Sequence, residues 1–312
     1  MKIFLAGATG VVGQRLLPAL RRAGHEVVGT TRNSAKAAEL AAAGAAPVVL
    51  DALDRKSVHQ AVGAARPDVV IHQLTAITAT NFKDLDGSFA ATNRLRTEAL
   101  DILLEAARAA GAKRFIAQSF TGWPNARTGA AVKTEDDPLD TRPARKSEQT
   151  LAAIRHLEQA TTNADGVEGL ALRFGLLYGP GTALAAGGEM LEMIRKRKMP
   201  VVGSGAGVFS FIHVVDAAGA TVDAVENGRS GIYNIVDDEP APVATWLPYL
   251  AEVIGAKPPQ KVPAWLVRPM LGELGVNIMT AGRGSSNAKA KRKLNWALSY
   301  PSWRQGFHHL AP

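Results

Sequence analysis

The stretch that decides the fold is Lys2-Ile3-Phe4-Leu5-Ala6-Gly7-Ala8-Thr9-Gly10-Val11-Val12-Gly13. Its apolar beginning predicts a buried strand over Lys2–Gly7, and the helical spacing of apolar residues predicts a helix over Val11–Ala23. Glycines between a strand and a helix permit positive φ angles and a close approach of the backbone to a ligand. The amides that open the helix favour a pyrophosphate group, so this turn predicts a dinucleotide site.

The residues that follow repeat the same alternation. The predicted strands cover Glu26–Thr31, Pro47–Leu50, Asp68–His72, Lys113–Ser119 and Gly169–Phe174. The predicted helices cover Ser34–Ala43 (with Ser34 as N-cap), Arg55–Ala65, Leu85–Ala110 and Arg145–Thr161. Such alternation forms parallel βαβ units, and the wholly apolar strands predict helices on both faces of the sheet. The expected fold is α/β, a doubly wound parallel sheet of the Rossmann type with a smaller C-terminal substrate lobe.

The glycines and prolines that cluster after Tyr178 mark a change in the organisation of the chain. Residues 1–178 are expected to form the dinucleotide-binding domain, to which part of 209–236 returns, and residues 179–312 to form mainly the substrate-binding lobe. The apolar lining expected for this lobe is Trp246, Trp265, Leu266, Met270, Leu271 and Met279.

The composition excludes several classes of protein. Of the 312 residues, 46% are hydrophobic and 21% are charged, which is typical of a globular chain and not of a disordered or fibrous one. The absence of cysteine excludes disulfides, cysteine zinc sites, iron–sulfur clusters and thiol nucleophiles. The net charge is +8, and the basic runs Arg195–Lys198 and Lys289–Lys293 are interpreted as solvated helix faces. We expect a cytoplasmic protein without a metal, a nucleic-acid partner or a membrane partner.

Several motifs together resemble the extended branch of the short-chain dehydrogenase/reductase superfamily, the branch of NAD-dependent epimerases and dehydratases. They are the glycine turn with its G-x-x-G-x-x-G spacing, His72-Gln73-Leu74-Thr75, Thr92-Asn93, Tyr178-Gly179-Pro180-Gly181 and Phe211–Asp216. The resemblance implies the following cofactor-binding residues: Gly7, Thr9, Gly10, Val11, Val12, Gly13, Asp51, Ala52, Gln73, Leu74, Thr75, Gln118 and Gly175.

The end of the second strand indicates which dinucleotide binds. NAD sites usually place a carboxylate there for the ribose hydroxyls, but this chain has Thr30-Thr31-Arg32-Asn33. Because Arg32 can face a 2′-phosphate through a charge-assisted hydrogen bond, NADP(H) is expected in preference to NAD(H).

The resemblance also implies a Tyr-x-x-x-Lys pair that this chain does not have, so we expect an atypical member. Alignment on Glu158 places Thr150 and Ile154 at the two positions, and no tyrosine precedes Tyr178 in the chain. Phe120 stands where relatives carry a catalytic hydroxyl. The substitutes considered are Thr121, which follows the fifth strand, and Lys146, which is predicted on the same helix face as Thr150.

The leading functional hypothesis is an NADP(H)-dependent oxidoreductase of a small carbonyl-containing or apolar metabolite, because the cofactor carries the hydride chemistry. One alternative is a non-catalytic NADP(H)-binding sensor or regulatory protein. Another is an isomerase or lyase that retains its cofactor. The resemblance also leaves a homodimer open, because members of the superfamily often pair through the helices predicted at Leu85–Ala110 and Arg145–Thr161.

Overall fold

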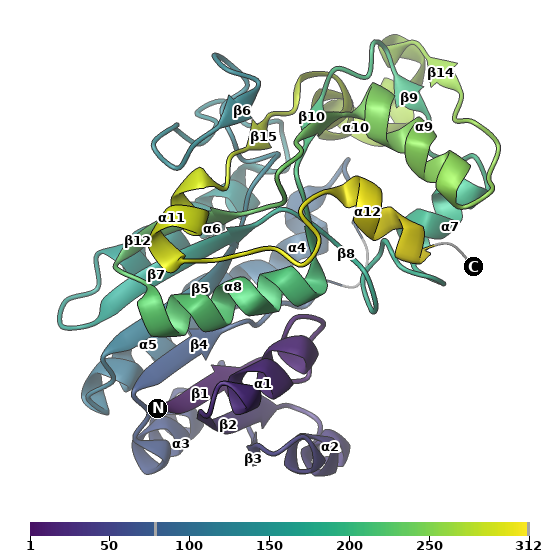
Figure 1. The fold of residues 1–312 in the computed structure, drawn as a ribbon. Coiled ribbons are helices and arrows are strands. Elements are labelled where there is room, and N and C mark those ends of the chain that lie inside the picture. Colours follow the sequence, from purple (N-terminus) through teal and green to yellow (C-terminus); the bar gives the residue numbers. More distant parts are fainter. Residues whose placement is uncertain (78–79, 311–312) are drawn as a thin grey trace.

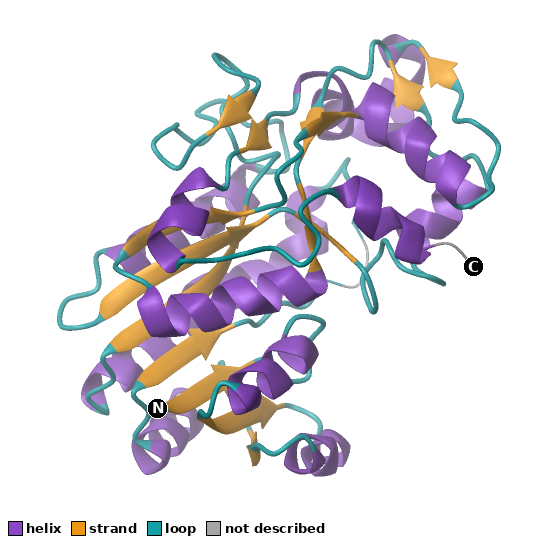
Figure 2. Cartoon of the chain, in the orientation of Figure 1, coloured by secondary structure: helices purple, strands orange, loops and turns teal. Residues whose placement is uncertain are grey.

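The sheet at the centre of the computed structural model, which describes residues 1–77 and 80–310, has seven strands in the order β12-β7-β5-β4-β1-β2-β3 (Figures 1 and 2). All the strand pairs are parallel. The strands are β1 (Lys2–Ala6), β2 (Glu26–Thr31), β3 (Ala46–Val49), β4 (Val69–His72), β5 (Arg114–Phe120), β7 (Glu168–Phe174) and β12 (Gly231–Ile235). This topology confirms the predicted doubly wound fold.

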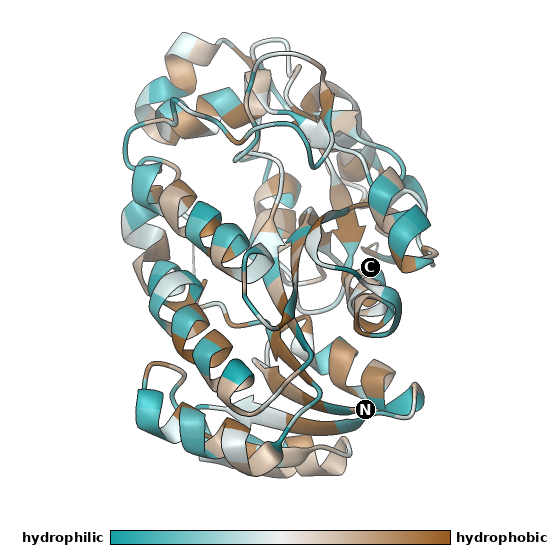
Figure 3. Cartoon of the chain, turned by 90° about the vertical axis from the view of Figure 1, so that its left-hand side faces the viewer, coloured by the Kyte–Doolittle hydropathy of each residue, from teal (hydrophilic) through white to brown (hydrophobic). Residues whose placement is uncertain are grey.

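Helices cover both faces of this sheet, because alternate residues of each strand point to opposite faces. In β1, Ile3 and Leu5 pack with α1 (Gly13–Arg22) and α8 (Val214–Asn227), whereas Phe4 packs with α3 (Arg55–Ala65) and α5 (Leu100–Ala109). The other helices beside the sheet are α2 (Ala37–Ala42), α4 (Leu85–Arg94), α6 (Glu148–Thr162) and α11 (Ala288–Leu294). Figure 3 shows apolar strands between helices whose outer sides are hydrophilic.

The C-terminal lobe has its own core, in which Trp246 and Trp303 are completely buried. Its helices are α7 (Glu189–Arg195), α9 (Val243–Val253), α10 (Ala264–Ala281), α12 (Trp303–Phe307) and η3 (His308–Leu310). Its short strands are β8 (Leu176–Tyr178), β9 (Val201–Val202), β10 (Val208–Phe209), β11 (Phe211–His213), β13 (Ala241–Pro242), β14 (Lys261–Val262) and β15 (Gly284–Ser285), and β15 pairs with β6 (Val132–Lys133).

Of the predicted apolar lining of the lobe, Trp246 and Met279 instead belong to the core, and Leu271 is partly buried beside it. Trp265, Leu266 and Met270 lie on α10 and are exposed. Hydropathy alone could not distinguish the buried residues from the exposed ones, because both sets are apolar.

Three helix predictions need correction. The side chain of Asn33, not Ser34, accepts the capping hydrogen bond of the turn η1 (Ser34–Lys36), from the amide of Ala35. The long helix predicted at Leu85–Ala110 is interrupted by a π-helical turn, η2 (Leu95–Ala99). Helix α6 begins at Glu148 rather than at Arg145.

Two segments of the second half of the chain return to the sheet. Strand β12 forms an edge of the sheet, and α8 packs on one of its faces. Helix α11 joins the same face through Ala290 and Leu294, a return that the sequence did not predict. Within residues 1–77 and 80–310, no helix is long and apolar enough to cross a membrane.

Candidate dinucleotide-binding and reaction site

The turn after β1 is closely packed at two of its three glycines. Gly7 has a φ angle of 97°, and a Cβ atom there would lie 2.8 Å from the carbonyl oxygen of Gln73. A Cβ atom at Gly13 would lie 2.2 Å from the carbonyl oxygen of Gly7. Only glycine allows the turn and α1 to approach the end of β4 this closely. Gly10 differs, because it is exposed and its Cβ atom would have a single close neighbour, at 3.3 Å.

The open side of this turn carries free backbone donors. Among the described residues, the amides of Val11 and Val12 have no hydrogen-bond acceptor, and no side chain caps α1. The unpaired amides and the positive end of the helix dipole favour an anion. The loop at Gly181 lies near, because a Cβ atom there would be 3.8 Å from Val11.

The end of β4 adds polar groups that lack partners. The side-chain amide of Gln73 is buried, and neither its nitrogen nor its oxygen has a hydrogen-bond partner among the residues that the structure describes. His72 orients the segment: its Nδ1 accepts from the amide of Leu74, and its Nε2 bonds the carbonyl oxygen of Leu95. Burial lowers the pKa of His72 to about 4, so it is neutral at pH 7. The sheet order reverses between β1 and β4, where ligands of such sheets bind. The open turn and the unpartnered amide therefore fit a dinucleotide.

The remaining predicted cofactor residues lie at neighbouring strand ends. Arg32 follows β2, Asp51 follows β3 and Thr75 follows β4, and all three are exposed. The others are Thr9 and Leu74, which are half-buried, Ala52, which is buried, and Gln118 in β5, which is half-buried. Gly175 has a packing reason to be glycine, because a Cβ atom there would lie 2.6 Å from the carbonyl oxygen of Ser210.

Thr150, at the position of the superfamily tyrosine, is fully engaged by hydrogen bonds. Its hydroxyl donates to the carboxylate of Asp86 over 2.7 Å and accepts from the amide of Asn93 over 3.0 Å. The same carboxylate accepts from the backbone amides of Gln149 and Thr150, and thereby caps α6 from the neighbouring helix α4. Thr150 therefore connects two helices and has no proton free for a substrate.

The two substitutes considered from the sequence also contact other residues of the chain. The hydroxyl of Thr121 is buried and lies 2.6 Å from the hydroxyl of Ser285, so it joins β5 to the lobe. Lys146 lies outside α6, with a φ angle of 63°, and its ammonium is 3.7 Å from Asp84. The prediction that Lys146 shares a helix face with Thr150 is therefore wrong, because α6 begins two residues later.

Tyr178 is the nearest tyrosine in the sequence, and it serves packing. Its side chain is completely buried and meets Phe211, His213 and Phe307 edge to face. Burial raises the pKa of its phenol well above the usual value. Within the described residues, no group of three or more acidic, histidine or cysteine side chains could hold a metal.

The sequence did not single out Asp86 or Arg96. Arg96 is buried on η2, whereas Asp86 is half-buried on α4 and bonds the first turn of α6. Arg96 precedes Leu100, Leu103 and Ala107 at helical spacing, so a charged residue in an apolar stripe was the available signal. No local signal identified Asp86, because its partner, Thr150, lies 64 residues away.

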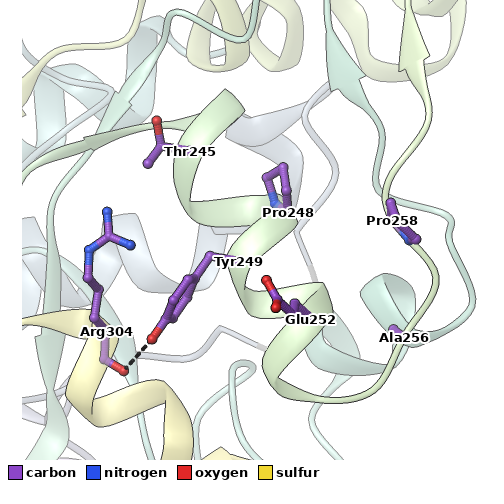
Figure 4. A pocket seen from close by; sticks show the side chains of 7 residues that line it. All are labelled: Thr245, Pro248, Tyr249, Glu252, Ala256, Pro258 and Arg304. Atoms are coloured by element: carbon purple, nitrogen blue, oxygen red, sulfur yellow. Dashed lines mark hydrogen bonds between the residues drawn. The ribbon is translucent and has the colours of Figure 1, made fainter.

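An open pocket of about 390 Å³ lies elsewhere, between α9 and α12 in the lobe (Figure 4). Its lining is Thr245, Pro248, Tyr249, Glu252, Ala256, Pro258 and Arg304. None of the cofactor-binding residues predicted from the sequence belongs to it.

Comparison with known proteins agrees with this geometry. The sequence model of the NAD dependent epimerase/dehydratase family matches residues 3–236. The chain belongs to this family. The family depends on nicotinamide dinucleotides. This chain is also 45% identical over 307 residues to a "3-diazoavenalumate denitrifying reductase" of Streptomyces sp, and the match covers 98% of this chain and 99% of that protein. Together these findings support an NAD(P)-dependent oxidoreductase.

Solved structures share the fold of this epimerase/dehydratase family member. A UDP-glucose 4-epimerase of Thermotoga maritima superposes with a TM-score of 0.78 at 20% identity, covering 99% of this chain and 97% of that one. The human epimerase family protein SDR39U1, solved with NADPH, superposes with a TM-score of 0.74 at 20% identity, covering 100% and 99%. At this level of identity the likeness establishes the fold.

Gly10→Val should remove dinucleotide binding and keep the fold. The branched side chain would occupy the open side of the turn, whereas only one backbone atom must shift to accept its Cβ. We expect NADPH affinity, measured by calorimetry, to fall by more than ~100-fold, or ~2.7 kcal/mol. The melting temperature should change little, whereas the comparison variant Gly13→Ala should unfold at a clearly lower temperature. NADPH binding by Gly10→Val at the wild-type level would contradict the assigned site.

Thr150→Val should destabilise the protein without weakening NADPH binding. The change leaves Asp86 and Asn93 without the threonine hydroxyl, and should lower the free energy of unfolding by about 1–3 kcal/mol. Denaturant unfolding measures this loss, and the control Thr150→Ser, which keeps the hydroxyl, should recover most of it. Unchanged stability of Thr150→Val would show that the connection between α4 and α6 is unimportant.

Proposed function

We propose that this chain is an NADP(H)-dependent reductase that replaces the diazo group of a small aromatic compound with hydrogen. The observation that carries the proposal is that three hydroxyl groups of the described residues, those of Thr150, Thr121 and Tyr178, are not free to act as the acid. Thr150 and Thr121 are both engaged in hydrogen bonds, and the raised pKa of Tyr178 keeps its proton in place. The similar Streptomyces protein is named as a reductase of a diazo compound, and its likeness spans both chains.

The chemistry of a diazonium group on an aromatic carbon needs no such acid. The dinucleotide, when bound, supplies a hydride, that is, one hydrogen with two electrons. A carbon–hydrogen bond forms, the carbon–nitrogen bond breaks and its electron pair leaves with dinitrogen, so ArN₂⁺ and H⁻ give ArH and N₂. Reduction of a ketone would instead require a proton for the new hydroxyl group, which the superfamily tyrosine normally provides.

The residues of the chain then have three tasks. The turn at Gly7–Gly13 and the unpartnered amide of Gln73 would hold the dinucleotide. The connection from Asp86 to Thr150 keeps α4 and α6 in register beside it. The apolar cluster of Phe89, Trp123, Leu274 and Ile278 packs the first half of the chain against the lobe, which helps to exclude water.

Arg32 supports NADP(H) as the preferred dinucleotide. It is exposed directly after β2, and Thr30, Thr31 and Asn33 beside it provide no carboxylate. Arg32→Ala should weaken NADPH binding about tenfold to a hundredfold, because a charge-assisted contact with the 2′-phosphate is lost, and leave NADH binding nearly unchanged. Calorimetry with both cofactors measures this, and equal affinities of the wild type for NADPH and NADH would contradict the preference.

The proposed reaction is tested with 4-diazobenzoate as the probe and NADPH deuterated at C4. We expect enzyme-dependent release of dinitrogen, with deuterium from the cofactor in the benzoate formed and none from D₂O solvent. A reaction without protein and one with Gly10→Val give the background rate. Turnover of ketones and aldehydes without dinitrogen release would overturn the diazo assignment. Tight NADPH binding with no turnover of either class would favour the non-catalytic alternative.

A further inference from the structure

Arg96, on the π-helical turn η2, is a buried cation to which the described residues offer no hydrogen-bond acceptor or counterion. Its side chain is 7% exposed, and its guanidinium makes no hydrogen bond or ion pair with any described residue. Burial lowers the pKa of Arg96 to about 10, so the group remains charged at neutral pH. A buried charge without a counterion is costly and is not retained for stability. The guanidinium therefore needs an explanation outside the folded chain.

Glu158, the carboxylate whose charge acts on Arg96, is already bonded to another arginine. Glu158 accepts two hydrogen bonds of 2.7 Å from the guanidinium of Arg173 and one of 2.7 Å from the hydroxyl of Ser119. His72, which the charge of Arg96 also affects, is neutral. Two arginines therefore share one carboxylate in this buried region, which leaves one excess positive charge.

The turn η2, which carries Arg96, packs beside α6. Asn93, one turn before Arg96, bonds Thr150, and Asp101, beyond Arg96, lies 2.8 Å from the Nε2 of His156. Arg96 therefore lies between two contacts that hold its helical segment against α6.

One aromatic ring lies beside the guanidinium. Its central carbon lies 5.7 Å from the centroid of the Phe89 ring. Phe89 and Trp123, which follows β5, belong to the same apolar cluster, together with Leu274 and Ile278 of the lobe. An aromatic ligand with a negative group would match this combination of rings and charge.

We propose that Arg96 binds an anionic oxygen of an aromatic substrate, either a carboxylate or a phenolate. This assignment rests on the proposed function and adds the substrate class to it. The anion belongs to the substrate, because the charged pyrophosphate of the dinucleotide is assigned to the turn at Gly7–Gly13. Arg96 would hold the ring beside Phe89 and so position the carbon that receives the hydride.

The test is binding without turnover. Benzoate, 4-nitrophenolate and the neutral benzamide are titrated by calorimetry into protein saturated with NADP⁺. Arg96→Met should weaken binding of the anion that wild type prefers about tenfold to a hundredfold, because charge-assisted bonds are lost, and leave benzamide and NADP⁺ affinities within about twofold. Arg96→Lys should recover part of the affinity. The matched control is Arg94→Met, which removes an exposed arginine paired with Glu98 on the same helical segment.

Thermal unfolding of the cofactor-free protein gives a second readout. Arg96→Met should melt at the wild-type temperature or above it, because it removes an unpaired buried charge. Unchanged anion affinity in Arg96→Met, or a loss of NADP⁺ affinity of the same size, would overturn the assignment. Since these measurements need no reaction, arginine-dependent anion binding without dinitrogen release would overturn only the proposed reaction. The reverse result would overturn only the role of Arg96.

Discussion

The close approach between the turn after β1 and the end of β4 is the constraint on which the site depends. Gly7 and Gly13 have no room for a side chain, since their Cβ atoms would meet backbone atoms of Gln73 and Gly7. This packing brings the start of α1 to the point where the sheet order reverses, and it leaves the amides of Val11 and Val12 open. The dinucleotide site is thus a consequence of how tightly one helix rests on the sheet.

A second constraint is the connection between α4 and α6 through Asp86, Thr150 and Asn93. Asp86 caps α6 and accepts a hydrogen bond from the hydroxyl of Thr150, while the side-chain amide of Asn93 donates a hydrogen bond to the same hydroxyl. In a superfamily member with the usual pair, the residue at position 150 acts on the substrate. Here it holds two helices together, so the hydride chemistry must proceed without a phenol or must find its proton elsewhere.

The charges buried near α6 do not balance within the described residues. Arg173 neutralises Glu158 within the core, and Arg96 adds a charge that the described residues do not neutralise. A cation that faces aromatic residues suits an anionic aromatic ligand better than it suits a neutral sugar. The fold is shared with a sugar epimerase, whereas a shared fold does not fix the substrate.

The sequence by itself determined the sheet, the glycine turn and the dinucleotide class, because these depend on local periodicity and on glycines at fixed offsets. The sequence also predicts that the Tyr-x-x-x-Lys pair is absent, because no tyrosine precedes Tyr178. Only the tertiary structure decided the tasks of Thr150, Lys146 and Arg96. Thr150 meets Asp86 across 64 residues of sequence, and Lys146 lies outside the helix on which it was expected. The sequence could not show that Arg96 lacks a bonded carboxylate among the described residues. Arg173 bonds both carboxylate oxygens of Glu158, and such pairing depends on contacts between distant segments of the chain.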